Sequence, residues 1–531
     1  MTFPIVAPYP SRRSPVMADN VVATSQPLAA QAGLEMLRLG GNAVDAALAA
    51  AAALTVVEPT GNGLGSDAFA ILWDGSALHG LNASGRSPAA WTPERFAGRS
   101  AMPERGWEAV TVPGAVGAWM ALNARFGTLP FETLLAPAIR LAEGGYPVTP
   151  MVAATWARSV ATLKDQPGFA RTFLPGGRAP APGERFSNPA AAADLRLIAA
   201  TKGEAFYRGE IAERIVADAA RHGGAMTLDD LAAEAPDWCG TVRGSFDAAE
   251  LHEIPPNGQG IAACMALGIL EHLPVRCFGP DEPEAVHLMI EAMKLALRDA
   301  EEYVADLGHM TSVGVEDLLA PGYLATRAAM VDPGRAQDFG AGAPKAGGTV
   351  YLTAADASGM MISFIQSNYM GFGSGVVPEG TGVSLQNRGC GFSLAPGSQN
   401  RVGPRKRPFH TIIPGFVMKN GAPEMSFGVM GGPMQAQGHV QMVLRTQLWD
   451  QDVQSAADAP RWRITHGLGV ACEQAMDPGL VEALRALGHQ ITLETPDVSF
   501  GFGGAQLIRR LPGGGYSAGS DPRKDGCAVG F

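Results

Sequence analysis

The stretch that follows a pair of glycines, Gly347 and Gly348, constrains this 531-residue chain more than any other. Residues 349–355 are rich in residue types that favour β-strands, and 356–359 have the composition of a turn. Residues 360–368 then resume the strand pattern. The sequence therefore predicts a β-hairpin whose first residue is a threonine.

A threonine hydroxyl is a weak nucleophile until a base takes its proton. The α-amine of the same residue can be that base, because a free α-amine titrates near pH ~7.7 to 8.0. An intact peptide nitrogen has no such basicity. We therefore expect the Thr349 hydroxyl to attack the Gly348 carbonyl, and hydrolysis of the resulting ester to release Thr349 as a new N-terminus. The glycine pair allows the backbone geometry that this attack requires.

Alone, a Gly-Gly-Thr sequence before a strand indicates only an ordinary turn. The residues around it favour a catalytic role. The stretch resembles the nucleophile region of the γ-glutamyltransferase family of N-terminal-nucleophile hydrolases, closest to its cytoplasmic and acylase-type members. The matching residues are Thr349, Asp356, Gly359, Ser367, 371–378, 380–382, Phe392 and Ser393. The resemblance covers essentially the whole sequence and includes Gly-Gly-Asn-Ala-Val-Asp-Ala at 40–46 and Glu-Pro at 58–59.

The resemblance implies an α+β fold, a four-layer αββα sandwich with two sheets between helices. It also implies a large chain of residues 1–348 and a small chain of residues 349–531, which together form one interlocked unit. Residues 330–346, rich in Gly, Ala and Pro, are expected to be an exposed tail that cleavage sets free.

Periodicity and turn residues predict the main elements independently of the resemblance. Helices are expected at 28–39, 43–54, 118–125, 136–145, 291–300 and 480–487, after the turn at 255–260, and around His439. Strands are expected at 415–419, 425–429 and 501–508.

Composition and charge exclude several classes of function. A net charge of −11 disfavours nucleic acid or an anionic membrane as the main partner. No signal peptide or membrane-spanning run is evident, so we expect a cytoplasmic protein. The six cysteines lack metal-ligand spacing, and we expect no metal and no organic cofactor.

Attack on an amide creates an oxyanion, which needs donors that already point at it. The resemblance assigns this role to the backbone N–H groups of Gly431 and Gly432. It also assigns to Ser367 a hydroxyl that hydrogen-bonds the nucleophile, where the family usually has threonine.

The specificity positions depart from the family pattern. Gly391, Tyr369 and Arg388 stand where γ-glutamyl enzymes keep the Asp, Asn and Gln or Glu that hold the substrate α-amine. His410 and Thr411 replace a pair of serines.

A lost carboxylate and a gained arginine leave a substrate ammonium without a partner, so an amide that carries a carboxylate and no adjacent amine fits better. Arg86, two residues beyond the position of the family arginine, and Arg388 are the expected carboxylate ligands, because guanidinium binds carboxylate in a fork. A structural ion pair is the alternative for each.

Three functional interpretations follow. The first is a self-cleaving γ-glutamyltransferase-type amidohydrolase for γ-glutamyl or related carboxylated amides, with transfer to amines open. The second is an acylase for glutaryl, cephalosporin-type or other dicarboxylic monoamides. The third is an uncleaved, non-catalytic binding protein. The expected partners are the small-molecule amide and the two chains of one precursor, with a homodimer of that pair left open.

Overall fold

Two antiparallel sheets form the centre of the protein in the computed structural model, which describes residues 13–340, 348–495 and 501–531. One sheet contains, in order across it, β1 (Val16–Ala18), β18 (Tyr516–Ser520), β17 (Gly504–Arg510), β13 (Ala422–Met430), β12 (Gly415–Lys419), β9 (Ala249–Glu253) and β8 (Val242–Phe246). The other contains β19 (Cys527–Gly530), β2 (Val21–Thr24), β10 (Gly348–Ala355), β11 (Met361–Tyr369), β3 (Asp67–Trp73), β4 (Leu78–Ala83) and β7 (Asp237–Trp238).

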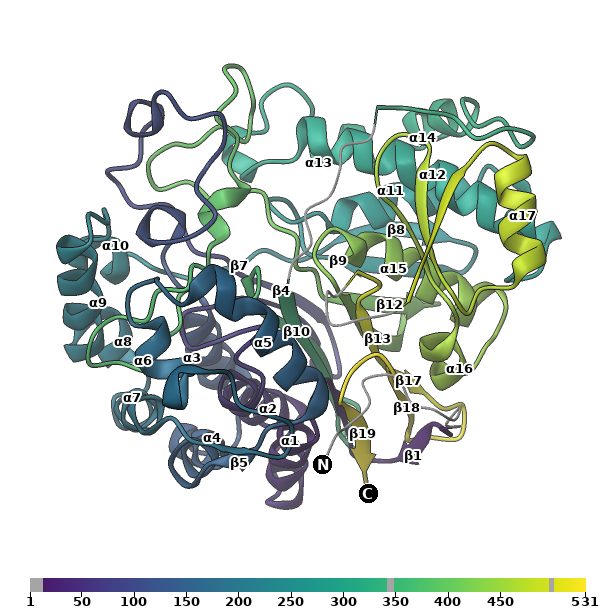
Figure 1. Ribbon diagram of the computed structural model, residues 1–531. Helices are drawn as coiled ribbons and strands as arrows, with labels where there is room; N and C mark the ends of the chain where they lie inside the picture. Colours follow the sequence, from purple (N-terminus) through teal and green to yellow (C-terminus); the bar gives the residue numbers. More distant parts are fainter. Residues whose placement is uncertain (1–12, 341–347, 496–500) are drawn as a thin grey trace.

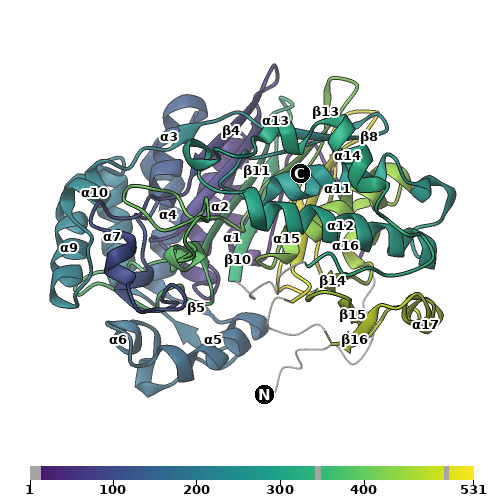
Figure 2. The same ribbon diagram turned by 90° about the horizontal axis from the view of Figure 1, so that it is seen from above.

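Helices cover the outer face of each sheet, which gives the four layers that Figures 1 and 2 show. The sheet with β10 is covered by residues of the N-terminal helices: α1 (Pro27–Arg38), α2 (Ala43–Val57), α3 (Ala115–Phe126), α4 (Phe131–Gly144), α5 (Pro150–Leu163), α6 (Phe169–Phe173), α7 (Pro189–Ala200), α8 (Glu204–Arg208), α9 (Glu210–Arg221) and α10 (Leu228–Ala232). The later helices cover the other sheet: α11 (Gly260–Leu270), α12 (Pro283–Tyr303), α13 (Val315–Leu318), α14 (Pro321–Ala328), α15 (Met434–Val443), α16 (Val453–Asp458) and α17 (Pro478–Ala486).

Strand β10 lies between two hydrophobic cores, so its side chains alternate between them. Val350 and Leu352 pack in the core shared with the N-terminal helices. Tyr351 instead packs in the core between the two sheets, and Thr353 hydrogen-bonds there to Ser426 of β13 at 2.6 Å. By the same alternation, the side chain of Thr349 faces the space between the sheets.

Smaller sheets flank this sandwich. One consists of β14 (Trp462–Ile464), β15 (Gly469–Glu473) and β16 (Gln490–Glu494), and the other of β5 (Tyr146–Pro147) and β6 (Arg185–Phe186). In Figure 2, α5 and the β14–β16 sheet lie on the same side of the two large sheets.

The hairpin expected from the sequence is confirmed as β10 and β11, with a turn in which Gly359 has a φ of 96°. The expected helices and later strands are also present, most of them with small differences at their ends. Two helix starts were wrong: α12 begins at Pro283, eight residues before the expected start, and α4 begins at Phe131, five residues before the expected start, and contains Pro137. Proline lacks only one N–H, so the remaining hydrogen bonds and a buried face hold the helix through it.

The segment 331–338 is partly exposed, as expected for residues 333–335 and 338, but it is also anchored to the rest of the fold. The Ala336 N–H donates to the Leu487 carbonyl at 2.7 Å, and the Gln337 N–H donates to Glu291 at 3.1 Å. Lys294, fully buried in α12, donates to the Gln337 carbonyl at 2.9 Å. Composition could not show these contacts, because the partners are distant in sequence. Residues 341–347, including Gly347, lie outside the described residues.

No helix within the described ranges is both long and apolar enough to cross a membrane.

Candidate active site

Thr349 lies at an irregularity in the pairing of β10 with β11. Gly348 pairs with Tyr369 and Val350 pairs with Gln366, so β11 has one residue more than β10 between these pairs. Such a bulge redirects side chains, and bulges are frequent beside active sites. Tyr369 completes the distortion with a φ of 75°, which is unusual for a residue other than glycine.

Three oxygen atoms meet at this bulge. The Thr349 hydroxyl donates to the Gly348 carbonyl oxygen at 2.8 Å, and the Ser367 hydroxyl donates to the same oxygen at 2.8 Å. The two hydroxyl oxygens are 3.2 Å apart. Ser367 also accepts the Tyr369 N–H at 2.8 Å. The predicted nucleophile, its predicted hydroxyl partner and the predicted scissile carbonyl are therefore in direct contact, and all three residues are buried.

Arg388 joins this group from the 3₁₀ turn Arg388–Gly391 and is fully buried. Its guanidinium donates to Thr411 Oγ1 at 2.9 Å and to Ser367 Oγ at 3.4 Å, and lies 4.2 Å from the centre of the Tyr369 ring. Its Nε has no hydrogen-bond acceptor among the described residues. Burial lowers the pKa of Arg388, and the nearby charge of Asp67 acts in the opposite direction.

His410 and Asp67 form a buried pair next to Arg388. Asp67 Oδ2 lies 3.0 Å from His410 Nε2 and 4.0 Å from Arg388 Nε. His410 Nδ1 accepts the Ile412 N–H, so Nε2 carries the proton and donates to Asp67. Burial, followed by the charges of Arg388 and Arg407, lowers the pKa of His410 well below its usual range. Burial raises the pKa of Asp67 to about 7, although Arg388 acts to lower it.

Gly431 and Gly432 connect β13 to α15 with φ angles of 121° and 62°, which favour glycine. Their carbonyls accept N–H groups of the helix start: Gly431 from Met434 at 3.3 Å and Gly432 from Gln435 at 3.1 Å. In a trans peptide the N–H points opposite to the preceding carbonyl. The Gly432 N–H is therefore directed away from the helix, which suits an oxyanion donor.

Two buried glutamines that no sequence motif singles out complete the site. Gln259 donates to the carbonyl oxygens of Thr411 at 2.5 Å and Gly432 at 2.9 Å. Gln435 Nε2 lies 3.5 Å from Thr349 Oγ1. The only signal for Gln435 in the sequence is its place three residues after the glycine pair, which alone does not indicate contact with a residue 86 positions away.

Arg86, the other arginine expected to bind a carboxylate, lies elsewhere. Its guanidinium contacts Asp306 at 3.3 Å and Asp237 at 3.6 Å, and its side chain is 39% exposed. Those are the contacts of a structural ion pair. The structure thus brings Thr349, Ser367, Tyr369, Arg388, His410 and Thr411 together and leaves Arg86 in a separate group of charges.

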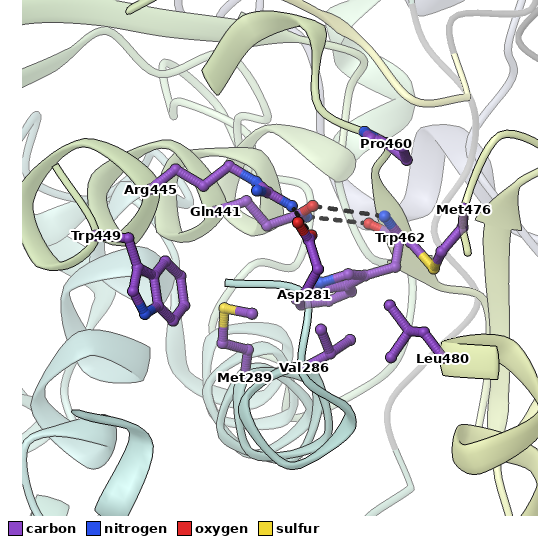
Figure 3. Close-up of a pocket in the computed structure, with 10 residues that line it drawn as sticks. All are labelled: Asp281, Val286, Met289, Gln441, Arg445, Trp449, Pro460, Trp462, Met476 and Leu480. Carbon is purple, nitrogen blue, oxygen red and sulfur yellow. Dashed lines mark hydrogen bonds and ion pairs between the residues drawn. The ribbon is translucent and has the colours of Figure 1, made fainter. Parts of the chain in front are cut away.

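Two other groups of side chains lie outside this site. A pocket beside α15 is lined by Asp281, Val286, Met289, Gln441, Arg445, Trp449, Pro460, Trp462, Met476 and Leu480 (Figure 3). None of them is a predicted site residue.

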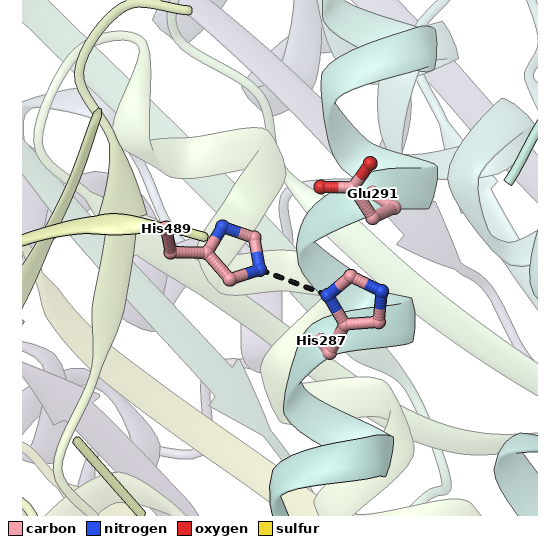
Figure 4. Close-up of side chains that lie close together, drawn as sticks. All are labelled: His287, Glu291 and His489. Carbon is pink, nitrogen blue, oxygen red and sulfur yellow. Dashed lines mark hydrogen bonds between the residues drawn. The ribbon is translucent and has the colours of Figure 1, made fainter. Parts of the chain in front are cut away.

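The second group consists of His287, Glu291 and His489, whose ligand atoms lie within 4.8 Å of one another (Figure 4). Most of their polar atoms already make protein contacts, and His489 Nδ1 is the one that has no hydrogen-bond partner among the described residues. His287 bonds His489 at 2.9 Å and the Asp332 carbonyl at 2.9 Å, and Glu291 pairs with Lys294 at 2.7 Å. We interpret this group as the anchor of segment 331–338 on α12.

Comparisons with known proteins agree with this geometry. The sequence profile of the family described as gamma-glutamyltranspeptidase matches residues 29–531. The chain is 37% identical to the oxamate amidohydrolase proenzyme of Klebsiella pneumoniae, with 98% of this chain and 99% of that protein covered. It is 35% identical to the glutathione hydrolase-like YwrD proenzyme of Bacillus subtilis, with 98% and 100% covered.

Among solved structures, the cephalosporin acylase of Bacillus halodurans superposes with a TM-score of 0.95 at 46% identity, and the match covers 100% of this chain and 99% of that one. Matches of this length and identity, together with a buried threonine at the head of β10, have a single consequence for classification. The chain belongs to the gamma-glutamyltranspeptidase family and is a proenzyme hydrolase of the N-terminal-nucleophile type.

Proposed function

We propose that the protein cleaves itself before Thr349 and then uses Thr349 to hydrolyse amides that carry a carboxylate. The observation that carries this proposal is the contact of the Thr349 hydroxyl with the Gly348 carbonyl, at 2.8 Å. A nucleophile must lie close to the carbonyl that it attacks, and this one is held there by strand pairing and by Ser367.

Self-cleavage follows from this geometry in two steps. Thr349 Oγ bonds to the Gly348 carbonyl carbon, the Gly348–Thr349 C–N bond breaks, and the proton lost by Oγ reaches the departing nitrogen. Water then hydrolyses the ester and leaves a Gly348 carboxylate and a free Thr349 hydroxyl. Ser367 supports the first step, because its hydroxyl donates to the carbonyl oxygen on which negative charge develops.

Substrate hydrolysis repeats this chemistry on another amide. The freed α-amine of Thr349 takes the proton of Oγ as Oγ attacks the amide carbon, and it then gives that proton to the leaving amine. The N–H groups of Gly431 and Gly432 are the proposed donors to the oxyanion. Water releases the acyl group as a carboxylic acid and restores the Thr349 hydroxyl.

The two processed chains, 1–348 and 349–531, would remain associated. Within one sheet, β10 pairs with β2 and β11 pairs with β3, so the β10–β11 hairpin of the small chain lies between strands of the large chain. Separating the chains would break both ladders and expose the cores on either side of them.

The substrate class follows from Arg388. A buried guanidinium beside Ser367, with an Nε that lacks an acceptor among the described residues, offers N–H groups to a carboxylate on the acyl part of a substrate. The oxamate amidohydrolase and the cephalosporin acylase among the similar proteins make such amides reasonable substrates for this chain too.

The Asp67 carboxyl group is not free to bind the ammonium group of a substrate. Its oxygens accept the Gly85 N–H at 3.0 Å and the His410 N–H at 3.0 Å, and Arg388 lies between it and Ser367. A γ-glutamyl amide, with an ammonium beside its carboxylate, is the second candidate, and the similarity to a glutathione hydrolase-like protein favours it.

Purified, processed enzyme should be compared on γ-glutamyl, glutaryl and oxamate-type amides. We expect kcat/KM for a glutaryl amide to equal or exceed that for the matching γ-glutamyl amide. A site built to pair the ammonium would lose activity on its removal, because its polar groups would lose their partner. A strong preference for the γ-glutamyl compound would therefore establish the second candidate.

A further inference from the structure

The side-chain amide of Gln435 has a fixed orientation beside the nucleophile. Gln435 is the second residue of α15 and is fully buried. Its Oε1 accepts the Ile413 N–H at 2.9 Å. An amide oxygen must face this donor, so the NH₂ group is on the other side, with Nε2 3.5 Å from Thr349 Oγ1.

This orientation is built into the site. The Gln435 backbone N–H donates to the Gly432 carbonyl at 3.1 Å, and Gln259 donates to the same carbonyl at 2.9 Å. Gln259 also holds the Thr411 carbonyl, two residues before Ile413. Hydrogen bonds thus join three segments: the turn at Gly431 and Gly432, the start of α15, and the residues around Ile413 that precede β12. Together they direct the Gln435 amide at Thr349.

Ser367 and Gln435, whose side chains both contact the Thr349 hydroxyl, act on different atoms. The Ser367 hydroxyl donates to the Gly348 carbonyl oxygen. Gln435 has no contact with that oxygen among the described hydrogen bonds and instead approaches Oγ1 itself. A neutral amide cannot take a proton from a hydroxyl at ordinary pH, so Gln435 is not the base. It can donate to Oγ when that atom carries negative charge, and catalytic hydrogen bonds that are long at rest tighten at that stage.

We propose that Gln435 is a catalytic residue that donates a hydrogen bond to Thr349 Oγ as this oxygen leaves an ester. The proposal rests on the proposed role of Thr349 as nucleophile. When water adds to the ester carbon and gives up a proton, the C–Oγ bond breaks and its electron pair goes to Oγ, which takes up that proton and ends as a hydroxyl. The Gln435 N–H stabilises the charge that builds on Oγ before its proton arrives. The same step occurs in self-cleavage, on the Gly348 ester, and in substrate turnover, on the acyl-enzyme.

Self-cleavage allows a test that needs no knowledge of the natural substrate. In the Gln435→Met variant, which keeps the volume and loses the donor, cleavage should stall at the ester. We expect the processing rate to fall about 10- to 100-fold, the effect of losing one charge-assisted hydrogen bond. Hydroxylamine should restore cleavage, because it attacks the ester directly and leaves a Gly348 hydroxamate that mass spectrometry detects.

Gln441→Met is the matched control. Gln441 lies on the same helix, is also buried, and donates to the carbonyls of Gln437 and Trp462 rather than to Thr349. Figure 3 shows its contact with Trp462. This variant should process at the wild-type rate and gain nothing from hydroxylamine. Gln435→Glu is the second variant if Gln435→Met does not fold, since its carboxylate still accepts the Ile413 N–H but has no amide proton. It should show the same hydroxylamine-dependent cleavage.

Unchanged processing of the Gln435 variants, or an equal defect in Gln441→Met, would overturn the role of Gln435. A wild-type chain that never cleaves before Thr349 would instead overturn the proposed function. The two failures are therefore distinguishable in one set of gels and mass spectra.

Discussion

The Thr349 hydroxyl and the Gly348 carbonyl oxygen are 2.8 Å apart at the head of β10, and Ser367 on the neighbouring strand bonds the same carbonyl oxygen. The atoms that self-cleavage requires are thus held by sheet pairing between β10 and β11. Both hydroxyls lie on the faces of their strands that point into the space between the two sheets. The site is a product of strand register, so changes in the polar groups around it should alter chemistry more than folding.

Ser367→Ala should slow self-cleavage and leave the fold intact. The variant loses the side-chain donor to the Gly348 carbonyl oxygen, so we expect processing to be about 10-fold slower or more, the effect of one charge-assisted hydrogen bond. Ser367→Thr, which restores a hydroxyl, is the control and should process well. A time course on denaturing gels measures both rates. Equal rates for wild type and Ser367→Ala would remove Ser367 from the first step.

Replacing Gly432 by valine should lower kcat by roughly 10²-fold or more, as losses of oxyanion donors do. The φ of Gly432 is 62°, which a β-branched residue rarely adopts, so the turn would shift and the N–H would lose its aim. The measurement is kcat on processed enzyme with an intact fold by circular dichroism. A folded, processed variant with unchanged kcat would exclude this N–H, and Gly431→Val tests the neighbouring one.

Arg388→Ala should weaken binding of a carboxylated substrate in the transition state by about 1.5 to 3 kcal/mol, the value of a charge-assisted hydrogen bond. Arg86→Ala is the comparison, because Arg86 pairs with Asp306 and Asp237 instead of reaching Ser367. We expect kcat/KM on a glutaryl amide to fall for Arg388→Ala and to change little for Arg86→Ala. The reverse ranking would make Arg86 the carboxylate ligand.

Some parts of the fold and of the site could be predicted from the sequence, and others depend on tertiary packing. The hairpin at 348–369 and the glycine turn at 431–432 were predictable, because turn residues and strand propensity act locally. Family resemblance supplied Ser367 and the four layers. Nothing local distinguishes Arg86 from Arg388, because their partners are set by packing between segments hundreds of residues apart. Gln435 was missed for the same reason.

The tertiary contacts of segment 331–338 could not be predicted from the sequence either. Its glycine, alanine and proline content suggested an exposed tail. The structure anchors it through Ala336 and Gln337 to partners on α12 and after α17. The composition of a segment indicates only its local conformational preference. The position of 331–338 is fixed by hydrogen bonds to residues that are distant in the sequence.

The free energy of unfolding should depend on pH through the titration of Asp67. Its pKa is about 7 in the folded protein because it is buried, compared with about 3.9 in an unfolded chain. Between these values the folded state keeps a proton that the unfolded state loses. Stability therefore falls as pH rises through this window, with a slope of at most about 1.4 kcal/mol per pH unit for one proton.

Asp67→Asn removes this titration. Denaturant unfolding of both proteins at pH values from about 4.5, above the unfolded pKa, to about 7.5, just above the folded pKa, should show that wild type loses stability relative to Asp67→Asn as pH rises. Because the substitution leaves Arg388 without its neighbouring carboxylate, the variant is expected to be less stable overall, and the difference between the two curves is the informative quantity. A difference that stays constant, or that grows in favour of wild type with pH, would contradict a raised pKa for Asp67.

Intact-mass and N-terminal analysis of the purified protein tests the central claim most directly. The account predicts two chains, residues 1–348 and residues 349–531, with Thr349 as the new N-terminus and both chains co-purifying under native conditions. Thr349→Ala should give one uncut, inactive chain of the same fold. A wild-type protein that stays a single chain and is nonetheless active, or one whose new N-terminus is another residue, would contradict the account.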